Sequence, residues 1–312
     1  MPETVAFLMT PDFAMMSAAA AIEPLRAANR LAGHDLYSIR FLSAAGGALS
    51  SSCGGMFETT PINSQEDFVD KLFVVAGGNP FALTGRQEMP FLRHAARHGT
   101  QLGGISGGSV LLARAGLMAN RRFTVHWEHM DAMREEFPDL MIEKRLFVLD
   151  RDRATCAGGV APLDMMHALI RARHGAALAS AVSDWFIHTR VRVADDAQRT
   201  QETDETRFHA TVATAVRLME DHIADPLSLD QIARLCGISA RQLQRRFGID
   251  FGRSVVSHYM RLRLSKADEL VRQTRLSIGE IAVATGFSSQ SNFTRAYSDL
   301  HGMSPRERRS RG

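Results

Sequence analysis

The chain has 312 residues, of which 45% are hydrophobic and 23% charged, and its formal net charge is +3. This length fits two ordinary domains, and the composition is typical of a soluble globular protein. Three scattered cysteines, Cys53, Cys156 and Cys236, are too few for a disulfide framework or a zinc site, so we expect a reducing compartment and neither a metal nor a cofactor. No basic run precedes an apolar core at the start, and no apolar run approaches the ~20 residues that cross a bilayer, so we expect no signal peptide and no membrane contact.

The first 190 residues alternate short apolar runs with stretches of helical periodicity. Strands are predicted at residues 5–9, 37–43, 72–76, 101–105 and 122–127, and a strand hairpin at 147–156. Helices are predicted at residues 15–29, 90–98, 108–115, 162–173 and 176–188. Strands that are apolar throughout are typical of a sheet buried on both faces, and their alternation with helices predicts an α/β doubly wound fold. Whether the last helix packs on the sheet or forms a dimer contact stays open.

Residues 104–108, Gly-Ile-Ser-Gly-Gly, match the G-x-S-x-G pattern, in which a strand turns sharply into a helix and presents one side chain above the sheet edge. The glycines are needed because neighbouring backbone crowds such a turn. In an enzyme, Ser106 would be the nucleophile, and His126, 20 residues downstream at the end of a strand, could be its base. The other interpretation of Ser106 is a turn residue that satisfies only backbone groups.

The same sheet edge gathers the side chains that we expect to contact a small molecule. The candidates are Gly78, Asn79, Ser106, Gly107, His126 and Trp127. Trp127 could lie against a quaternary ammonium group through cation–π attraction, although a core histidine and a packing ring would give the same pair at 126–127. Glu23 and Asp164 could balance a cationic ligand or simply cap and solvate their helices.

These features give residues 4–190 a resemblance to the DJ-1/PfpI superfamily, which is similar to class I glutamine amidotransferases. The resemblance is carried by Gly77-Gly78, by residues 104–108 running into 111–117, by residues 124–127 and by residues 155–159. Active members use Cys at the elbow beside an acidic residue; this chain has Ser106 there, and the acid position falls near Ser17. A serine needs a matched base and acid, and no such triad is evident. The resemblance implies a degenerate catalytic pocket that binds an effector; the alternative is a hydrolase or amidase that uses Ser106.

Residues 191–208 form a polar stretch whose composition is typical of a linker. We therefore expect a DJ-1/PfpI-like effector-sensing domain at residues 1–190, a linker at 191–208 and a second domain at 209–312.

The second domain contains one sequence pattern twice. Ser277 is a fitting helix N-cap, and Glu280 completes a capping box. Gly286 lies where the first helix must end in a left-handed turn. The same positions recur 49 residues earlier in Ser228, Gln231 and Gly237. Because a second helix follows each turn, we predict two helix-turn-helix motifs in an all-α domain; the alternative is a pair of ordinary helical hairpins.

Each second helix leaves polar side chains on the face opposite its buried aromatic residues. These recognition helices are predicted at about 240–247 and 290–297, and residues 255–272 form the rigid helix that sets their spacing. Side chains of this kind contact base edges or phosphates, although an ordinary solvated face is the alternative for any single residue. The candidate DNA contacts are Arg241, Gln242, Gln244, Arg245, Gln290, Ser291, Asn292, Thr294 and Arg295.

The distribution of charge supports DNA binding. Residues 209–312 contain 16 Lys and Arg against 10 Asp and Glu, whereas the remainder contains 21 against 24. The formal charge is therefore +6 in the second domain and −3 elsewhere. A surface that binds phosphates requires such a concentration of positive charge.

Residues 209–312 resemble the DNA-binding domain of the AraC/XylS family of bacterial transcription regulators, through the two motifs, the connecting residues 259–270 and the closing Gly302-Met303-Ser304-Pro305. The family often has Pro where this chain has Ser254. A DJ-1/PfpI-like domain ahead of such a domain resembles a subgroup of regulators that includes activators of arginine, carnitine and glycine betaine catabolism. The resemblance implies a cytoplasmic homodimer that binds double-stranded promoter DNA, responds to an amino acid or quaternary amine, and activates transcription by RNA polymerase.

Overall fold

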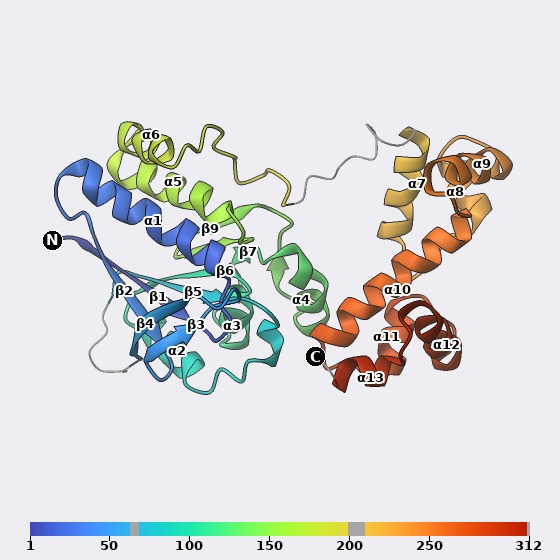
Figure 1. Cartoon of the computed structure of the whole chain (residues 1–312), viewed down its shortest axis with the longest axis horizontal. Coiled ribbons are helices and arrows are strands. Elements are labelled where there is room, and N and C mark those ends of the chain that lie inside the picture. Colours follow the sequence, from blue (N-terminus) through green and yellow to red (C-terminus); the bar gives the residue numbers. More distant parts are fainter. Residues whose placement is uncertain (63–68, 199–209, 311–312) are drawn as a thin grey trace. The chain divides into compact units, whose positions relative to one another are not determined.

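The computed structural model describes residues 1–62, 69–198 and 210–310 (Figure 1). The chain divides into two compact units, Met1–Gln198 and Arg199–Gly312. Most of the predicted linker, from residue 199 onwards, lies outside the described residues. Among the helices that are described, none combines the length and the apolar character needed to span a membrane.

The first unit is built on one sheet with the strand order β3-β4-β2-β1-β5-β6-β10-β9. Its strands are β1 (Glu3–Met9), β2 (Tyr37–Ser43), β3 (Gly47–Ser50), β4 (Met56–Pro61), β5 (Lys71–Ala76), β6 (Gln101–Ser106), β9 (Phe147–Asp150) and β10 (Arg153–Cys156). The six inner strands run parallel, and β3 and β9 pair antiparallel at the two edges. A parallel pair, β7 (Arg122–Phe123) with β8 (Met141–Ile142), lies outside this sheet.

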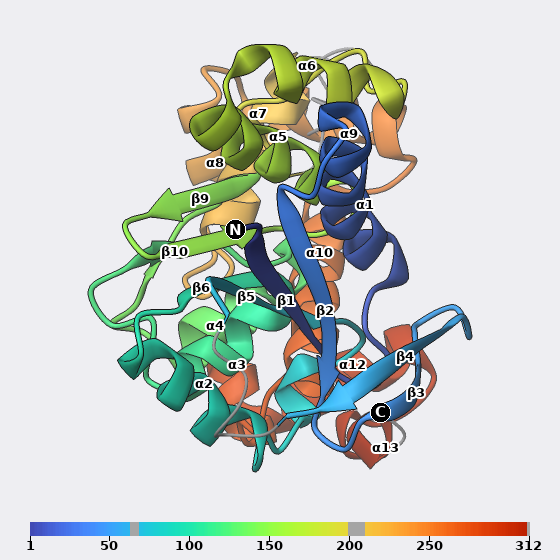
Figure 2. The ribbon, with the colours of Figure 1, turned by 90° about the vertical axis from the view of Figure 1, so that its left-hand side faces the viewer.

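Helices cover both faces of the sheet (Figures 1 and 2). The helices on one face are α1 (Met15–Ala32), α5 (Ala161–His174) and α6 (Ala176–Trp185). Those on the other face are α2 (Glu88–Arg97), α3 (Gly108–Arg114) and α4 (Met130–Glu136). Alternate residues of β1 enter opposite cores, Phe7 with α1 and α5 and Leu8 with α2 and α3. A central strand that is buried on both faces must be apolar throughout, and the predicted α/β doubly wound fold is confirmed.

Two local predictions in this unit differ from the structure, and one hairpin was not predicted. Only Arg122–Phe123 of the predicted strand at 122–127 is a strand, because the backbone groups of Thr124 bond to the side chains of Ser109 and Thr155. The helix predicted at 176–188 ends at Trp185, and it packs on α1 and α5. The hairpin β3–β4 has no predicted counterpart, since most of its side chains are exposed and no apolar run marks it.

The described residues of the second unit form helices only, and the two predicted helix-turn-helix motifs are confirmed. In chain order its helices are α7 (Ala210–Asp221), α8 (Leu229–Leu235), α9 (Ala240–Phe251), α10 (Val255–Gln273), α11 (Ile278–Ala284), α12 (Gln290–His301) and α13 (Pro305–Ser310). The first motif is α8 with α9, and the second is α11 with α12. The capping boxes of Ser228 with Gln231 and of Ser277 with Glu280 are both formed, which explains why the local sequence suffices to start α8 and α11.

Helix α10 holds the two motifs together. Its first half shares a core with α7, α8 and α9, and its second half shares a core with α11 and α12. Tyr259 donates a hydrogen bond to the carbonyl oxygen of His222 at 2.6 Å. One turn later, Arg263 donates to the carbonyl oxygens of Thr285 and Gly286 at 2.8 and 2.6 Å. Because one rigid helix shares a core with each motif, the spacing between α9 and α12 is set within this unit.

The turns of the two motifs differ in their surroundings. Gly237 and Gly286 both have positive φ, at 68° and 73°. A β-carbon at Gly237 would meet nothing within 4 Å, whereas one at Gly286 would lie 2.5 Å from Cγ of Pro226 and 2.7 Å from the carbonyl oxygen of Ile223. The turn of the second motif is therefore pressed against the connection between α7 and α8.

We predict that Gly286→Ala destabilises the second unit far more than Gly237→Ala. The left-handed backbone costs alanine roughly 1–2 kcal/mol at either position, and displacement of the crowded neighbours adds about 1–3 kcal/mol at Gly286 alone. Unfolding followed by far-ultraviolet circular dichroism measures this difference. Both tryptophans, Trp127 and Trp185, lie in the first unit, so their fluorescence transition is an internal control. Equal losses at the two glycines would contradict the contact with Pro226.

Candidate functional site

At the carboxyl end of β6 the chain turns into α3 with Ser106 in the left-handed region, at φ 58°. A β-carbon at Gly104 would lie 2.5 Å from Oγ of Ser109, and one at Gly108 would lie 1.9 Å from the carbonyl oxygen of Val74. The turn therefore requires glycine on both sides of Ser106, as the sequence pattern predicts. A non-glycine residue in this conformation costs about 1–3 kcal/mol, and such strain is concentrated at functional sites.

The loop that follows β10 encloses the Ser106 hydroxyl. Ser106 is 6% exposed, and a β-carbon at Gly158 would lie 2.9 Å from its Oγ. The N–H of Gly159 donates to the hydroxyl of Ser17 on α1 at 2.8 Å. Ser17 is buried beside this loop, so the place where the resemblance implies a carboxylate carries a neutral hydroxyl that is already bonded to the backbone. Ser17 has no charge with which to draw a proton from Ser106.

A buried thiol also lies at the elbow. Cys156, at the end of β10, is fully buried, and burial raises the pKa of its thiol to about 12, against weaker opposing hydrogen bonds from the backbone of Gly158 and Ser106. Because only a thiolate is a strong nucleophile, this cysteine stays protonated and inert under neutral conditions. It does not replace the elbow cysteine of active DJ-1/PfpI members.

His126 is joined to the elbow through its backbone, since its N–H donates to the carbonyl oxygen of Ser106 at 3.4 Å. Its ring Nδ1 accepts from the N–H of Glu128 at 3.3 Å and so caps the short 3-10 helix Trp127–His129. In the described part of the chain, no hydrogen bond links this ring to the Ser106 hydroxyl. Burial lowers the pKa of His126, so the ring is uncharged under neutral conditions. The centroid of the partly exposed Trp127 ring lies 5.2 Å from that of His126.

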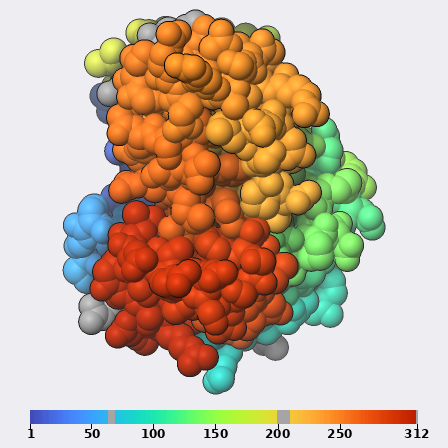
Figure 3. Space-filling model, turned by 90° about the vertical axis from the view of Figure 1, so that its right-hand side faces the viewer, coloured from blue at the N-terminus to red at the C-terminus, as the bar shows by residue number. Residues whose placement is uncertain are grey.

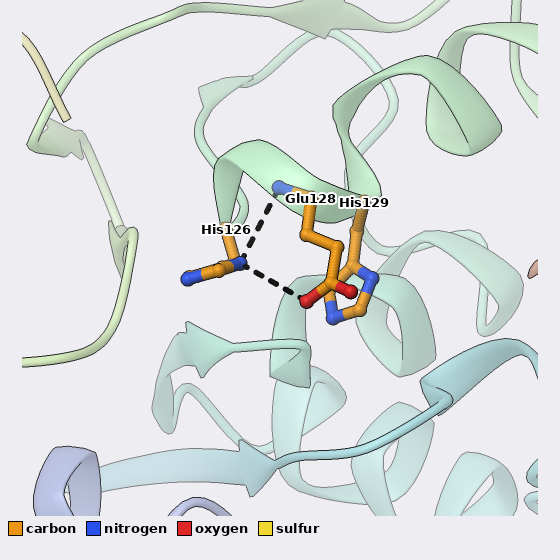
Figure 4. Close-up of side chains that lie close together, drawn as sticks. All are labelled: His126, Glu128 and His129. Atoms are coloured by element: carbon orange, nitrogen blue, oxygen red, sulfur yellow. Dashed lines mark hydrogen bonds and ion pairs between the residues drawn. The ribbon is translucent and has the colours of Figure 1, made fainter. Parts of the chain in front are cut away.

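His126, Glu128 and His129 are the side chains in the described residues that could hold a metal ion (Figure 4). Their ligand atoms lie within 4.8 Å of one another, and Nδ1 of His126 is 3.9 Å from the nearer Glu128 oxygen. A tetrahedral zinc ion with bonds of about 2.0–2.2 Å holds its donor atoms roughly 3.5 Å apart. The donor atoms of His126 and Glu128 are farther apart than zinc requires, so the side chains would have to move closer together to bind it. Nδ1 of His126 would also have to give up its hydrogen bond from the N–H of Glu128.

Gly78, Asn79 and Gly107 follow the neighbouring strands β5 and β6 and meet at the same sheet edge. Gly78 has φ 56°, and Asn79 caps the 3-10 helix Pro80–Ala82 by accepting from the N–H of Phe81 at 3.1 Å. A β-carbon at Gly107 would lie 2.8 Å from Cγ of Pro80. The carboxyl edge of a parallel sheet is where α/β folds bind ligands. We use the name elbow site for the group Ser17, Gly78, Asn79, Ser106, Gly107, His126 and Trp127.

The two candidate counter-ions, Glu23 and Asp164, are already paired. Glu23 binds Arg26 on the surface of α1 at 2.5 Å. Asp164 is 1% exposed, and Arg192 and His188 bind it at 2.7 and 2.9 Å. A cationic ligand at the elbow site would therefore rely on the Trp127 ring rather than on either carboxylate.

A surface hollow of about 420 Å³ lies at the opposite, amino-terminal end of the sheet. Its lining includes Glu3, which binds both Lys71 and Arg173 at 2.5 and 3.4 Å. With Asp70, which also lines the hollow, two carboxylates stand against two cations, so the hollow presents little net charge to a ligand. Since ligands bind at the carboxyl ends of parallel strands, the elbow site is the stronger candidate.

In the second unit, α9 and α12 present the residues predicted to contact DNA, and Figure 3 shows the side of this unit with the first motif in orange and the second in red. Their opposite faces are fully buried through Leu243, Phe247, Phe293 and Tyr297. Gln244 and Thr294 are half-buried. The exposed candidates are Arg241, Gln242, Arg245, Gln290, Ser291, Asn292 and Arg295.

Three of the candidates also make contacts within the second unit. Gln242 completes a capping box at the start of α9. Gln244 accepts from the N–H of Val255 at 3.4 Å, at the start of α10. Asn292 accepts from Arg295 at 3.3 Å. The exposed cations of α9, Arg241 and Arg245, are thus better placed than its two glutamines to contact DNA.

His258 on α10 is stacked against the core of the first motif. Its ring centroid lies 4.2 Å from that of Phe251 and 5.5 Å from that of Phe247. Burial, reinforced by the charges of Arg253 and Arg261, lowers the pKa of His258 to about 4. Since an unfolded histidine titrates near 6.5, the unfolded chain binds an additional proton between these two values. Stability from the neutral ring is complete above about pH 6.5 and is lost as the pH falls towards 4.

We predict that the second unit loses stability on acidification through this range, and that His258→Leu reduces the loss. Thermal unfolding followed by far-ultraviolet circular dichroism, at several pH values between about 4 and 7, measures the effect. The other histidines contribute alike to wild type and variant, so the difference between the two isolates His258. A pH dependence that the substitution leaves unaltered would show that this ring is not held neutral.

Two helix-turn-helix motifs pack on one shared helix and follow an α/β unit in the chain. This combination defines the class of the protein as a DNA-binding transcription regulator. Residues 232–311 match the model of a helix-turn-helix domain, and residues 3–172 match the model of the DJ-1/PfpI family. The chain belongs to the AraC-family transcription regulators that carry a DJ-1/PfpI domain ahead of the DNA-binding domain. The resemblances of both parts of the sequence are thereby confirmed.

Similar proteins extend over the whole chain. The HTH-type transcriptional regulator GlxA of Rhizobium meliloti is 43% identical, over 99% of this chain and 96% of its own length. The HTH-type transcriptional regulator GbdR of Pseudomonas aeruginosa is 37% identical, over 99% of this chain and 84% of its own. Among solved structures, an AraC family transcriptional regulator from Pseudomonas putida is 29% identical, with a TM-score of 0.55, and covers 59% of this chain and 100% of its own.

Proposed function

We propose that this transcription regulator is controlled by a small molecule that binds at the elbow site. The observation that carries the proposal is the strained turn at Ser106, kept beside a neutral Ser17 in place of an acid. Without an acid beside it, Ser106 is not activated as a nucleophile. The strained turn still places its hydroxyl at the edge of the sheet where α/β folds bind ligands. A ligand that binds there can shift an existing equilibrium of the protein towards a form with a different affinity for promoter DNA.

For the output, we propose that α9 and α12 enter successive major-groove segments of double-stranded DNA about one helical turn apart. Arg241, Arg245 and Arg295 have the charge and reach to bind phosphates or guanine edges, and Gln290 and Ser291 can bond to base edges. The names of the relatives as HTH-type transcriptional regulators support this output. We further propose that the protein acts as a homodimeric activator of RNA polymerase in the cytoplasm.

We predict that Arg245→Ala weakens binding to a duplex that the wild-type protein selects from a randomised library. Loss of a base or phosphate contact should cost about 1–3 kcal/mol, or roughly 5- to 150-fold in affinity. The neighbouring Arg246 is the matched control, because it donates to Thr211 of α7 at 2.7 Å. Arg246→Ala should lower the melting temperature and leave the affinity nearly unchanged. Fluorescence anisotropy titrations measure both, and a larger loss of affinity at Arg246 would reject this orientation of α9.

For the input, we propose an amino acid or a quaternary amine as the effector. Trp127 is 39% exposed, and an indole ring is the preferred aromatic partner of such a cation. The Ser106 hydroxyl can bond to a carboxylate or amide of the same ligand. Glu23 and Asp164 are engaged by Arg26 and Arg192, which favours recognition of the cation by the ring.

A second candidate function is a hydrolase or amidase that uses Ser106, and the G-x-S-x-G elbow favours it. Three observations oppose it. Ser17 is neutral, Cys156 is held protonated by burial, and the His126 ring bonds to the backbone of Glu128. A serine nucleophile needs a base aligned by a third group, and these residues do not supply one.

We predict that a thermal-shift screen of the full chain against amino acids and betaines finds a stabilising ligand, since a ligand at about 100 times its Kd contributes roughly 2.7 kcal/mol. Ser106→Ala and Trp127→Leu should weaken that shift and leave DNA binding intact. Trp185, 45% exposed on α6, supplies the control variant Trp185→Leu, which should keep the full shift. Ester or amide turnover by the wild type that Ser106→Ala abolishes would favour the enzyme instead.

A further inference from the structure

The segment that follows α6, residues 186–198, has no regular secondary structure, yet polar contacts hold it against the first unit. Near its end, the N–H of Leu146 donates to the carbonyl oxygen of Ala194 at 3.0 Å. Beside this bond, Arg145 pairs with Asp195 at 2.6 Å. This segment leads directly into the chain of the DNA-binding unit, so its attachment decides where that chain leaves the first unit.

The first strong attachment of the segment is at Asp164 on α5. Oδ1 of Asp164 accepts from the backbone N–H of Arg192 at 2.7 Å and lies 2.9 Å from Nε2 of His188. Oδ2 accepts from Nε and Nη2 of Arg192 at 3.0 and 2.7 Å. A carboxylate buried to this degree is destabilising unless it is paired and fully hydrogen-bonded. Asp164 therefore holds Arg192 as an anchor of the segment.

The second attachment is at Gln198, the last described residue of the first unit. Its Nε2 lies 2.9 Å from Oγ1 of Thr124, 3.0 Å from the carbonyl oxygen of Val125 and 2.8 Å from that of Arg145. The side-chain NH₂ group has two hydrogens to donate, and three acceptors lie within hydrogen-bond distance of it. The side chain of Gln198 thus ties the end of the segment to residues 124–125.

Residues 124–125 lead directly into the elbow site. Thr124 is fully buried, and its carbonyl oxygen accepts from the hydroxyl of Ser109 on α3 at 2.7 Å. His126, two residues after Thr124, donates from its N–H to the carbonyl oxygen of Ser106. Since a close-packed interior transmits displacements, a ligand that moves His126 also moves the acceptors of Gln198.

We propose that residues 186–198 form a latch that couples the elbow site to the DNA-binding unit, with Gln198 as its switch and Arg192 as its anchor. This inference rests on the proposed ligand function of the elbow site. The structure has the latch closed. A ligand that contacts His126 or Trp127 shifts residues 124–125, removes the acceptors of Gln198 and releases the end of the segment. Release of residues 196–198, which follow the contacts of Ala194 and Asp195, adds three residues, or about 10 Å of reach, to the connection between the units.

The test uses the full chain and the duplex that the wild type selects from a randomised library, placed ahead of a reporter gene. Gln198→Glu keeps the size of the side chain but sets an oxygen against two carbonyl oxygens, and Gln198→Ala removes the contact. Arg190→Ala, at an exposed position of the same segment, is the matched control. Hydrogen exchange of residues 122–130 measures the contact, and reporter expression without added ligand measures the coupling.

Both Gln198 variants should speed exchange at residues 124–128 and change reporter expression by at least about fivefold, the lower end of allosteric couplings. Arg190→Ala should leave both readouts at wild-type values. Tryptophan-fluorescence melting shows whether the first unit of each variant is folded, and a folded variant with unchanged exchange would refute the contact. Faster exchange with wild-type expression would refute the coupling and leave only a structural role.

Failure of the latch is distinguishable from failure of the proposed function. If the wild type selects no duplex, the DNA-binding proposal fails, and if no amino acid or betaine shifts its melting temperature, the proposed effector class fails. A wild type that passes both tests while the Gln198 variants behave as Arg190→Ala does would reject the latch alone.

Discussion

Charged groups removed from water must be paired, and this requirement places the segments of the protein that apolar packing alone would not specify. The buried carboxylate of Asp164 holds Arg192, and with it a segment that has no secondary structure. In the second unit the carboxylate of Asp268 accepts from Tyr297 and Arg308 and so holds α13 against α10. In both units a carboxylate on a well-packed helix holds a short segment, which is irregular in the first unit and helical in the second.

The two units differ in how firmly such contacts bind. In the second unit, apolar cores on both halves of α10 and the close approach of Gly286 to Pro226 make the spacing of the motifs rigid. In the first unit, the side-chain amide of Gln198 holds the last residues of the segment 186–198, after the contacts of Ala194 and Asp195. A single hydrogen bond contributes about 0.5–1.5 kcal/mol net, which is less than a moderately saturating ligand supplies. The spacing of the two motifs is thus held more firmly than the segment that precedes the second unit in the chain.

At the elbow, backbone geometry and chemical reactivity depend on different features of the structure. The strain at Ser106 and the crowding at Gly104 and Gly108 are properties of the backbone, and they persist. Reactivity depends instead on ionisable groups, and here the position beside the elbow holds the neutral Ser17, while burial keeps Cys156 protonated. The strained turn therefore persists at Ser106, while the His126 ring bonds to the backbone of Glu128.

The sequence by itself determined the parts of the protein that depend on short-range relations. Capping boxes join residues three apart, and glycines such as Gly286 mark turns, so both helix-turn-helix motifs could be predicted. The alternation of apolar strands with helices predicted the doubly wound sheet, and the elbow pattern located Ser106. Which side chains touch DNA or a ligand stays a prediction.

Only the tertiary structure decided which distant side chains meet. Ser17 and Gly159 are 142 residues apart, Gln198 and Thr124 are 74 apart, and no periodicity or local motif marks either pair. The strand prediction at 122–127 was wrong for the same reason, because the backbone of Thr124 bonds to side chains from other elements. Local sequence patterns reflect interactions between residues that are close in the sequence. The partner of a buried polar group instead depends on how the whole unit packs.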